Sequence, residues 1–388
     1  MIKTISILGA TGSIGLQTIE ILKTRDDYEL IAVSCKNNID GLTKIIEEFP
    51  SIKFASVENK SDASLLEEKF PKVEFFYDEK GLKELIKASN CDVYVNAISG
   101  FAGLIPSINI LKSNKVLLLA NKETLVVGGE IINNILDEGY GKLIPLDSEH
   151  VAISKCLYGK NIDNIEEIVI TASGGSFFNY SEEQLEKVTL EEAIKNPNWQ
   201  MGKKITIDSN LMINKCYELI EAFYLFRIPF EKISARVNRT SIVHGYVRFI
   251  GETRIDVEEP TMKEPIEYGL NFGLPKDLIK GFPNIKVNCL TLYDFEELSY
   301  KTYPVMRYAK FIVEQEGDAG CVFNACDEVA VQAFIDGKIK FTDIIKIIDM
   351  VMKDYKFSKN VNLHGLIKVD KKVREKTLRI IKRMEKQK

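Results

Sequence analysis

The amino-acid sequence predicts an α/β protein in three parts: an N-terminal parallel sheet wound by helices, an α+β middle part and a C-terminal helical bundle. Short β-rich runs alternate with amphipathic helical patterns up to residue 147, which is typical of parallel sheets. Strands and helices then mix up to residue 272, and the pattern beyond residue 300 is helical almost to the end. The 388 residues also exceed what one hydrophobic core usually supports, which favours several domains.

The N-terminal part, residues 1–147, has the alternation expected of a Rossmann-like, doubly wound sheet. Its first strand runs directly into a glycine turn and a helix over Leu16–Lys23. The expected strands are Thr4–Leu8, Glu29–Ser34, Phe54–Val57, Val93–Asn96, Lys115–Leu119 and Lys142–Leu146.

The middle part, residues 148–272, is expected to be a second domain that connects the other two and carries the substrate. Residues 273–299 are rich in Gly, Pro and Asn and predict a linker, and residues 300–388 predict a helical domain with breaks near Gly337 and Leu363. The middle part is expected to hold strands at Glu167–Thr171, Ser234–Val237, Ser241–Phe249 and Arg254–Val257, and a long helix from about Asn210.

Charge and composition exclude several classes of partner. The chain has 52 Lys and Arg residues against 56 Asp and Glu residues, without a polybasic block, so we expect no nucleic-acid binding. No apolar run approaches membrane-spanning length, and the N-terminus runs directly into a strand, so we expect neither a membrane span nor a targeting segment. The 7 cysteines lack metal-ligand spacing. A cytoplasmic location is the expectation.

The glycine turn after the first strand has the character of a phosphate-binding loop. Gly9-Ala10-Thr11-Gly12-Ser13-Ile14-Gly15 lies between a strand and a helix, so free N–H groups and the positive helix end face one site. The spacing departs from GxGxxG, and glycine turns also arise for packing alone. Its position in a βαβ context at the start of the chain favours a dinucleotide, with Thr11, Gly12, Ser13 and Ile14 as contacts.

The end of the second strand indicates which dinucleotide binds. Enzymes that use NAD usually place an acid there for the ribose hydroxyls, whereas this strand ends Ser34-Cys35-Lys36-Asn37. Lys36 with Ser34 and Asn37 would suit a 2′-phosphate, although Lys36 alone could be an ordinary surface residue. The missing acid independently favours NADPH.

Two groups of carboxylates point to a metal. Asp147 and Glu149 follow a strand, where positions i and i+2 of an extended chain face one side. Asn214, Glu218 and Glu221 share one face of a predicted helix whose other faces are apolar. A polar helix face is usually just solvated, but a second carboxylate group is available to converge with it. Carboxylates without His or Cys favour Mg²⁺ or Mn²⁺.

Phosphate-binding candidates lie between these carboxylate groups. Thr171–Ser176 follows a strand and could be either an anion-binding nest or a plain turn. Asp208-Ser209-Asn210 is interpreted as a helix N-cap, so Ser209 could be structural or could favour phosphate. The stretch Asn196–Gly202 holds the only tryptophan, Trp199, and could be a local anchor or a closing lid.

These motifs together identify a family resemblance over nearly the full chain. The sequence resembles 1-deoxy-D-xylulose 5-phosphate reductoisomerases, and the order and spacing of the motifs make the match specific. The matching blocks are GATGSIG (Gly9–Gly15), ANKET (Ala120–Thr124), LDSEH (Leu146–His150), ASGGSF (Ala172–Phe177), PNWQMG (Pro197–Gly202), DSNLMINKCYELIEA (Asp208–Ala222) and FNACDEVAVQAF (Phe323–Phe334).

The resemblance implies a homodimeric oxidoreductase of non-mevalonate isoprenoid precursor biosynthesis. It implies NADPH- and Mg²⁺- or Mn²⁺-dependent conversion of 1-deoxy-D-xylulose 5-phosphate to 2-C-methyl-D-erythritol 4-phosphate, by retro-aldol and aldol steps and a reduction. The implied metal ligands are Asp147, Glu149 and Glu218, which are catalytic together with Lys122. The implied substrate contacts are Ser148, Glu149, Ser173, Asn196, Trp199, Ser209, Asn214, Lys215 and Glu218, with a lid at about residues 195–203. The implied cofactor contacts are Thr11, Gly12, Ser13, Ile14, Cys35, Lys36, Asn37, Asn121, Glu123 and Gly202.

Three positions depart from the family pattern. The lid usually begins with His where this chain has Asn196, and the motif His-Pro-Gln-Ser reads Asn238-Arg239-Thr240-Ser241. The usual glycine before the Lys-Asn of strand two is Cys35. These changes bear on lid contacts with substrate, on local packing and on the 2′-phosphate geometry.

Two other functions compete with this interpretation. An NADP-dependent semialdehyde dehydrogenase has a similar glycine loop but needs a nucleophilic cysteine, and no cysteine here lies in a convincing catalytic loop. A non-catalytic phosphosugar-binding protein or a structural dimer would be expected to lose its carboxylates, and all three are present.

Overall fold

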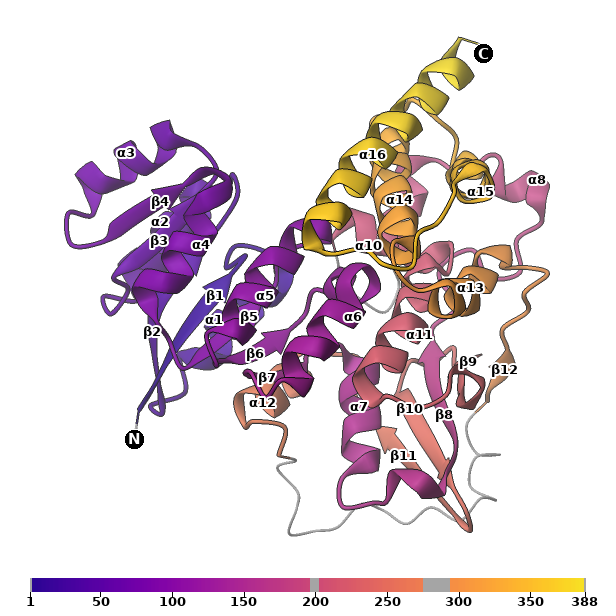
Figure 1. Cartoon of the computed structure of the whole chain (residues 1–388), viewed down its shortest axis with the longest axis horizontal. Coiled ribbons are helices and arrows are strands. Elements are labelled where there is room, and N and C mark those ends of the chain that lie inside the picture. Colours follow the sequence, from indigo (N-terminus) through magenta and orange to yellow (C-terminus); the bar gives the residue numbers. More distant parts are fainter. Residues whose placement is uncertain (1, 196–201, 275–293, 387–388) are drawn as a thin grey trace. The chain divides into compact units, whose positions relative to one another are not determined.

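The computed structural model describes residues 2–195, 202–274 and 294–386, which divide into two compact units (Figure 1). The first unit groups residues 1–124, 132–147 and 262–276, and the second groups residues 125–131, 148–261 and 277–388, apart from the undescribed residues within these ranges. The chain therefore changes unit between Asp147 and Ser148. Helix α6 (Glu123–Asp137) contributes residues to both units and departs from helical geometry at Gly128.

The first unit is built on a seven-stranded parallel sheet in the order β4-β3-β2-β1-β5-β6-β7. Its apolar strands are buried, as expected when helices cover a parallel sheet. The strand order reverses direction at β1, and ligands of such sheets bind at the carboxyl ends of the strands at this switch point. The strands are β1 (Lys3–Leu8), β2 (Tyr28–Ser34), β3 (Phe54–Val57), β4 (Glu74–Tyr77), β5 (Val93–Asn96), β6 (Val116–Leu119) and β7 (Lys142–Pro145).

Helices join the strands of this sheet in βαβ order. Helix α2 begins at an N-cap, Asn38, whose side chain accepts a hydrogen bond from the Gly41 N–H, so a polar residue sets the start of an apolar-faced helix. The doubly wound sheet predicted from sequence is confirmed, and one strand, β4, was not predicted. The helices are α1 (Ser13–Leu22), α2 (Ile39–Glu48), α3 (Lys60–Lys69), α4 (Asp78–Ser89), α5 (Leu104–Lys112) and, from the later part of the chain, α12 (Lys263–Leu270).

The second unit contains a mixed sheet in the order β11-β10-β8-β9-β12. Strands β8 and β9 pair in parallel and the other neighbours pair antiparallel. Gly245 in β10 allows helix α7 (Ser148–Leu157) to lie close, because a Cβ there would be 2.8 Å from Ile153 Cδ1. The strands are β8 (Ile165–Ala172), β9 (Ile233–Val237), β10 (Val243–Phe249), β11 (Glu252–Val257) and β12 (Glu296–Glu297).

The remaining helices of the second unit include the predicted C-terminal bundle. Helix α14 is its most buried member and contacts both α15 and α16. The predicted breaks are confirmed: α14 ends at Ile335, just before Gly337 with φ +73°, and α16 begins at Leu363. The helices are α8 (Glu182–Leu185), α9 (Leu190–Ala193), α10 (Lys203–Asn210), α11 (Ile213–Phe226), α13 (Arg307–Gln315), α14 (Ala319–Ile335), α15 (Asp343–Asp354) and α16 (Leu363–Glu385).

Two local predictions were wrong. The chain after Asp147 is not extended, because α7 begins at Ser148 and places Glu149 in its first turn, where a carboxylate favours the helix N-terminus. The long helix does not begin at Asn210, because α10 ends there and Met212 adopts a left-handed conformation with φ +59° before α11 starts. Among the described residues, no helix combines the length and apolar character that crossing a membrane requires.

Candidate active site

The glycine loop after β1 has the geometry required for a close approach of backbone to ligand. Gly9 has φ +83°, and a Cβ on Gly15 would lie 2.4 Å from the Gly9 carbonyl oxygen, so neither position tolerates a side chain without movement. Gly12 is the N-cap of α1 and forms no side-chain cap, which leaves the first turn of the helix for another hydrogen-bond acceptor. Thr11, Ser13 and Ile14 are partly or fully exposed at this turn.

The end of β2 leads directly into the other predicted cofactor contacts. Gly9 and Ala10 donate hydrogen bonds to the Ser34 carbonyl oxygen at 3.1 and 2.8 Å, which ties the glycine loop to this strand end. Lys36 and Asn37 are exposed, whereas Cys35 is buried, and burial raises the pKa of its thiol to about 11. Cys35 is therefore a packing residue whose backbone, rather than thiol, is available to a ligand.

Asn121 and Glu123 lie at the carboxyl end of β6 and are held by the loop that follows β5. The buried Asn121 amide donates to the carbonyl oxygens of Ile98 (2.7 Å) and Gly100 (2.9 Å), and the Gly100 N–H donates to Glu123 Oε1 at 3.1 Å. These bonds fix the edge of the sheet near the switch point. Lys122, between them in sequence, has its Nζ 2.7 Å from Asp147 Oδ2, and both side chains are largely buried.

The structure brings together the carboxylates that were predicted to bind metal. One ligand oxygen from each of Asp147, Glu149 and Glu218 lies within 4.8 Å of the other two. Glu149 is placed by the first turn of α7, and Glu218 by the second turn of α11. Asp147 and Glu149 lie close together as predicted, but the predicted reason was wrong. The segment is not extended, because helix α7 begins between the two residues at Ser148.

Lys215 lies inside this group rather than apart from it. Its Nζ is 2.7 Å from Glu149 Oε1 and also contacts Glu218 and the Thr171 carbonyl oxygen. Burial opposes its charge, but the two carboxylates more than offset this and raise the pKa of Lys215. The positive charge that the sequence suggested for phosphate is therefore engaged by acids in this structure.

Neighbouring side chains orient the carboxylates. Asn214 Nδ2 donates to Glu218 Oε1 at 2.5 Å, which confirms that positions i and i+4 share a helix face. Ser148 Oγ donates to Glu149 Oε2 at 2.5 Å. Because Glu218 is only 1% exposed, this face of α11 is not a solvated face.

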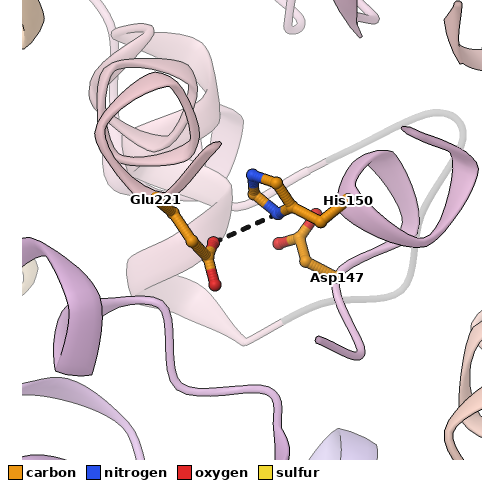
Figure 2. A group of neighbouring side chains, drawn as sticks. All are labelled: Asp147, His150 and Glu221. Carbon is orange, nitrogen blue, oxygen red and sulfur yellow. Dashed lines mark ion pairs between the residues drawn. The ribbon is translucent and has the colours of Figure 1, made fainter. Parts of the chain in front are cut away.

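A second group, Asp147, His150 and Glu221, lies beside the first (Figure 2). His150 Nδ1 is 3.2 Å from Glu221 Oε2, and its Nε2 is 3.0 Å from the Glu218 carbonyl oxygen. Both side chains are buried, at 0% and 1% exposure. One imidazole therefore links α7 to α11 through the Glu221 carboxylate and the Glu218 carbonyl oxygen. The sequence had named His150 only as part of a motif.

The Ser173–Ser176 loop forms a tight turn. Two of its backbone N–H groups already donate hydrogen bonds to protein side chains. Gly174 and Gly175 have φ of +87° and +69°. The Gly175 N–H donates to Ser173 Oγ at 3.3 Å, and the Ser176 N–H donates to Asn210 Oδ1 at 2.7 Å. Ser173 is partly exposed at the start of the turn.

The remaining predicted contacts have varied positions. The N-cap interpretation of Ser209 was wrong, because Ser209 lies near the end of α10 and its Oγ donates to the Ile205 carbonyl oxygen at 2.7 Å. Gly202 is the exposed N-cap of α10, where no atom of the described residues lies within 4 Å of a Cβ. Asn196 and Trp199 lie outside the described residues.

Arg239 is a residue at this site that the sequence did not assign. Its Nη1 donates to the carbonyl oxygens of Ser173 (2.7 Å) and Gly175 (3.2 Å). The only sequence signal was the departure from the family motif at positions 238–241, because contacts across more than sixty residues leave no periodic pattern.

Comparisons with known families agree over three segments of the chain. Residues 5–129 match the family profile described as "1-deoxy-D-xylulose 5-phosphate reductoisomerase". Residues 143–226 match its "C-terminal domain" profile, and residues 258–376 match a "DXP reductoisomerase C-terminal domain" profile.

Individual relatives match along nearly the whole chain. The 1-deoxy-D-xylulose 5-phosphate reductoisomerase of Caldanaerobacter subterraneus is 38% identical over 380 residues, covering 97% of this chain and 99% of the relative. That of Thermoanaerobacter pseudethanolicus is 39% identical over 377 residues, covering 96% and 98%.

Solved structures agree with the sequence comparisons. The Zymomonas mobilis enzyme "in complex with NADPH" has a TM-score of 0.86 at 33% identity and covers 98% of this chain and 99% of its own. A reductoisomerase "in complex with NADPH, fosmidomycin and magnesium" has a TM-score of 0.89 at 29% identity, covering 99% of both chains. This chain belongs to the 1-deoxy-D-xylulose 5-phosphate reductoisomerase family.

Proposed function

We propose that the chain converts 1-deoxy-D-xylulose 5-phosphate to 2-C-methyl-D-erythritol 4-phosphate with NADPH and a divalent cation. The observation that carries this proposal is the convergence of Asp147, Glu149 and Glu218, whose ligand oxygens lie within 4.8 Å of one another. Relatives crystallised with NADPH and with magnesium support the same cofactors.

The carboxylate group fits a hard divalent cation. Asp147, Glu149 and Glu218 would all supply oxygen ligands, which suit Mg²⁺ or Mn²⁺. The Lys215 ammonium contacts Glu149 and Glu218, which supports a site that attracts positive charge. A bound Mg²⁺ or Mn²⁺ would act as a Lewis acid toward the carbonyl and hydroxyl oxygens of the ketose. Asp147, Glu149 and Glu218 would hold it.

Neighbouring residues keep the three carboxylates in position. Lys122 Nζ donates to Asp147, Asn214 donates to Glu218, and Ser148 donates to Glu149. Such supporting hydrogen bonds fix the orientation of ligand oxygens and tune their basicity. The side chains of Lys122, Ser148, Asn214 and Lys215 also offer donors to substrate oxygens once the carboxylates are engaged elsewhere.

The first unit would bind NADPH at the carboxyl ends of its strands. Backbone N–H groups of residues 11–14 at the α1 N-terminus would bind the pyrophosphate, and Lys36 with Asn37 would bind the 2′-phosphate. Cys35, Asn121, Glu123 and Gly202 complete the proposed contacts. NADPH supplies the hydride that reduces the rearranged aldehyde.

The substrate phosphate would bind to hydroxyl and amide donors of the second unit. Ser173 and Ser209 belong to segments that touch each other, because the Ser176 N–H donates to Asn210 next to Ser209. Asn196 and Trp199 remain proposed lid contacts on the basis of the family resemblance.

We also propose the domain limits, assembly and location that the sequence suggests. Residues 1–147 form the NADPH domain, residues 148–272 the catalytic domain, residues 273–299 a linker and residues 300–388 the helical domain. The enzyme is a cytoplasmic homodimer. The edge strand β11, with Val257 42% exposed at its end, offers a surface where a second copy could pair.

The test is to follow NADPH absorbance with 1-deoxy-D-xylulose 5-phosphate, with and without Mg²⁺ or Mn²⁺. We expect metal-dependent turnover that Glu218→Gln lowers at least about a hundredfold, since it removes a charged ligand but not the side-chain volume. Glu166→Gln is the matched control, because Glu166 is an exposed carboxylate on β8, and it should leave turnover unchanged.

Two outcomes would contradict the proposal. The first is turnover without a divalent metal, which would exclude the proposed metal-binding role of Asp147, Glu149 and Glu218. Binding of the ketose phosphate without any oxidation of NADPH would favour a non-catalytic phosphosugar-binding protein, the alternative from another functional class.

A further inference from the structure

Arg239 braces the Ser173–Gly175 loop from the turn between β9 and β10. Its Nη1 donates to the carbonyl oxygens of Ser173 and Gly175, and its guanidinium lies 4.9 Å from the centroid of the Phe178 ring. A Cβ on Gly174 would be only 2.4 Å from this Nη1, so the glycine leaves the space that the guanidinium occupies. The arginine and the loop are thus fitted to each other.

Arg239 adds a positive charge beside this loop. It forms no ion pair with any residue of the described ranges 2–195, 202–274 and 294–386. Lys215, the other cation considered for phosphate, contacts Glu149 and Glu218. Among the described cations, Arg239 therefore makes the loop's potential more positive through direct contact with its carbonyl oxygens.

The loop that Arg239 braces lies against the other proposed phosphate contact. A Cβ on Gly175 would be 2.8 Å from Asn210 Oδ1 and 3.3 Å from the Ser209 carbonyl oxygen. Ser173 and Ser209 therefore belong to adjoining backbone segments within one unit. The guanidinium charge acts on the same small region as their hydroxyl groups.

The turn that presents Arg239 is itself well fixed. The Asn238 N–H donates to the Ala172 carbonyl oxygen at 2.8 Å, and Thr240 Oγ1 donates to Asn238 Oδ1 at 2.9 Å. Asn238 is 1% exposed, whereas Arg239 is exposed.

We propose that Arg239 is a specificity-determining residue for the phosphate of the substrate. It supplies a guanidinium charge beside the Ser173–Gly175 loop, while one of its nitrogens holds the loop carbonyls. Arginine suits both tasks, because its five N–H donors lie in a rigid plane and it stays charged at all working pH values. The proposal rests on the proposed function, since it assumes that a ketose phosphate binds at this loop.

The experiment compares Arg239→Gln with Arg239→Lys in the full-length enzyme. Glutamine keeps an amide donor for the carbonyls but removes the charge, whereas lysine keeps the charge. We expect Arg239→Gln to raise KM for the ketose phosphate, and Ki for inorganic phosphate, by roughly fivefold to tenfold. The values of kcat and of KM for NADPH should stay within about twofold, and lysine should restore most of the phosphate affinity.

Salt dependence and a control variant separate charge from packing. The KM of the wild type should rise more steeply with ionic strength than that of Arg239→Gln, because a charge interaction is screened. Arg248→Gln is the control, since Arg248 is an exposed arginine on β10 that pairs with Glu166 and Glu167, and it should leave KM unchanged.

Two results would overturn the proposal. The first is an unchanged KM and phosphate Ki in Arg239→Gln. The second is an equal loss in the glutamine and lysine variants without any change in salt dependence, which would make Arg239 a structural brace only. Absence of turnover in the wild type would instead refute the proposed function, and calorimetric phosphate affinities of wild type and Arg239→Gln would then decide the role of the charge.

Discussion

A partly buried lysine, Lys204, joins helix α10 to the C-terminal bundle, and its replacement provides a quantitative test of the fold. Lys204 Nζ on α10 lies 2.5 Å from Asp208 Oδ2 and 2.7 Å from Asp327 Oδ2 on α14. The Tyr217 hydroxyl donates to the same Asp327 oxygen at 2.9 Å. Asp327 is fully buried, and Lys204 is 26% exposed. One ammonium thus serves two carboxylates.

Lys204→Met would remove the ammonium that both carboxylates contact. Breaking a buried ion pair in this way costs about 3–5 kcal/mol, and we expect about 3 kcal/mol because Lys204 is partly exposed. Asp327→Asn should cost no more than about 1 kcal/mol, since one cation and one carboxylate remain and the amide oxygen still accepts from Tyr217. The double variant Lys204→Met/Asp327→Asn should recover about 2 kcal/mol of the loss.

The pH dependence of this loss has a defined sign. Burial raises the pKa of Asp327 above its usual 3.8, against the opposing effects of Lys204 and Tyr217. The folded protein therefore binds a proton at Asp327 more readily than the unfolded protein does. The stability that this protonation contributes is fully present below pH 3.8, and it is lost as the pH rises through the pKa of Asp327 in the folded protein. The defect of Lys204→Met should accordingly shrink on acidification.

Urea denaturation followed by circular dichroism, at about pH 7.5 and about pH 5.5, measures both effects. A Lys204→Met variant as stable as the wild type at the higher pH would refute the argument. So would a double variant that is no more stable than Lys204→Met, because the loss would then not come from the Asp327 carboxylate that had lost the Lys204 ammonium.

Two further predictions concern other parts of the chain. Lys36→Glu should lower kcat/KM for NADPH by about tenfold or more, because it replaces the proposed 2′-phosphate partner with an acid. The kcat/KM for NADH should change much less. Equal effects on both cofactors would exclude this role. Gly320→Ala should destabilise the second unit by about 1–3 kcal/mol, since its Cβ would lie 1.8 Å from the Val126 carbonyl oxygen. Gly202→Ala is the control in thermal denaturation, because no atom of the described residues lies within 4 Å of its Cβ. Equal melting temperatures of the two variants would contradict the close packing at Gly320.

Local patterns predicted the sheet of the first unit well because its strands are apolar and buried. Phe54–Val57 and Val93–Asn96 were predicted with the boundaries that the structure has. Strand β4 was missed because Glu74–Tyr77 is short and follows charged residues, so its pattern does not stand out. The break at Met212 could not be predicted either, since neither glycine nor proline marks the left-handed residue between α10 and α11.

The candidate site was predictable only where its contacts are local or follow a helical period. Asn214 and Glu218 lie four residues apart and form the expected contact. By contrast, Lys215 binds Glu149, which lies 66 residues earlier in the chain. No periodic pattern in the sequence predicts such a pair. The same limit explains why the sequence identified Ser173 but not the arginine that braces its loop.

The gathering of buried carboxylates at this site gives a physical reason for a divalent cation. Four carboxylates gather there, from Asp147, Glu149, Glu218 and Glu221, and His150 lies among them. Two lysines, Lys122 and Lys215, contact this group. Clustered buried carboxylates are costly to ionise unless cations pair with them. A divalent cation would add two positive charges to this group.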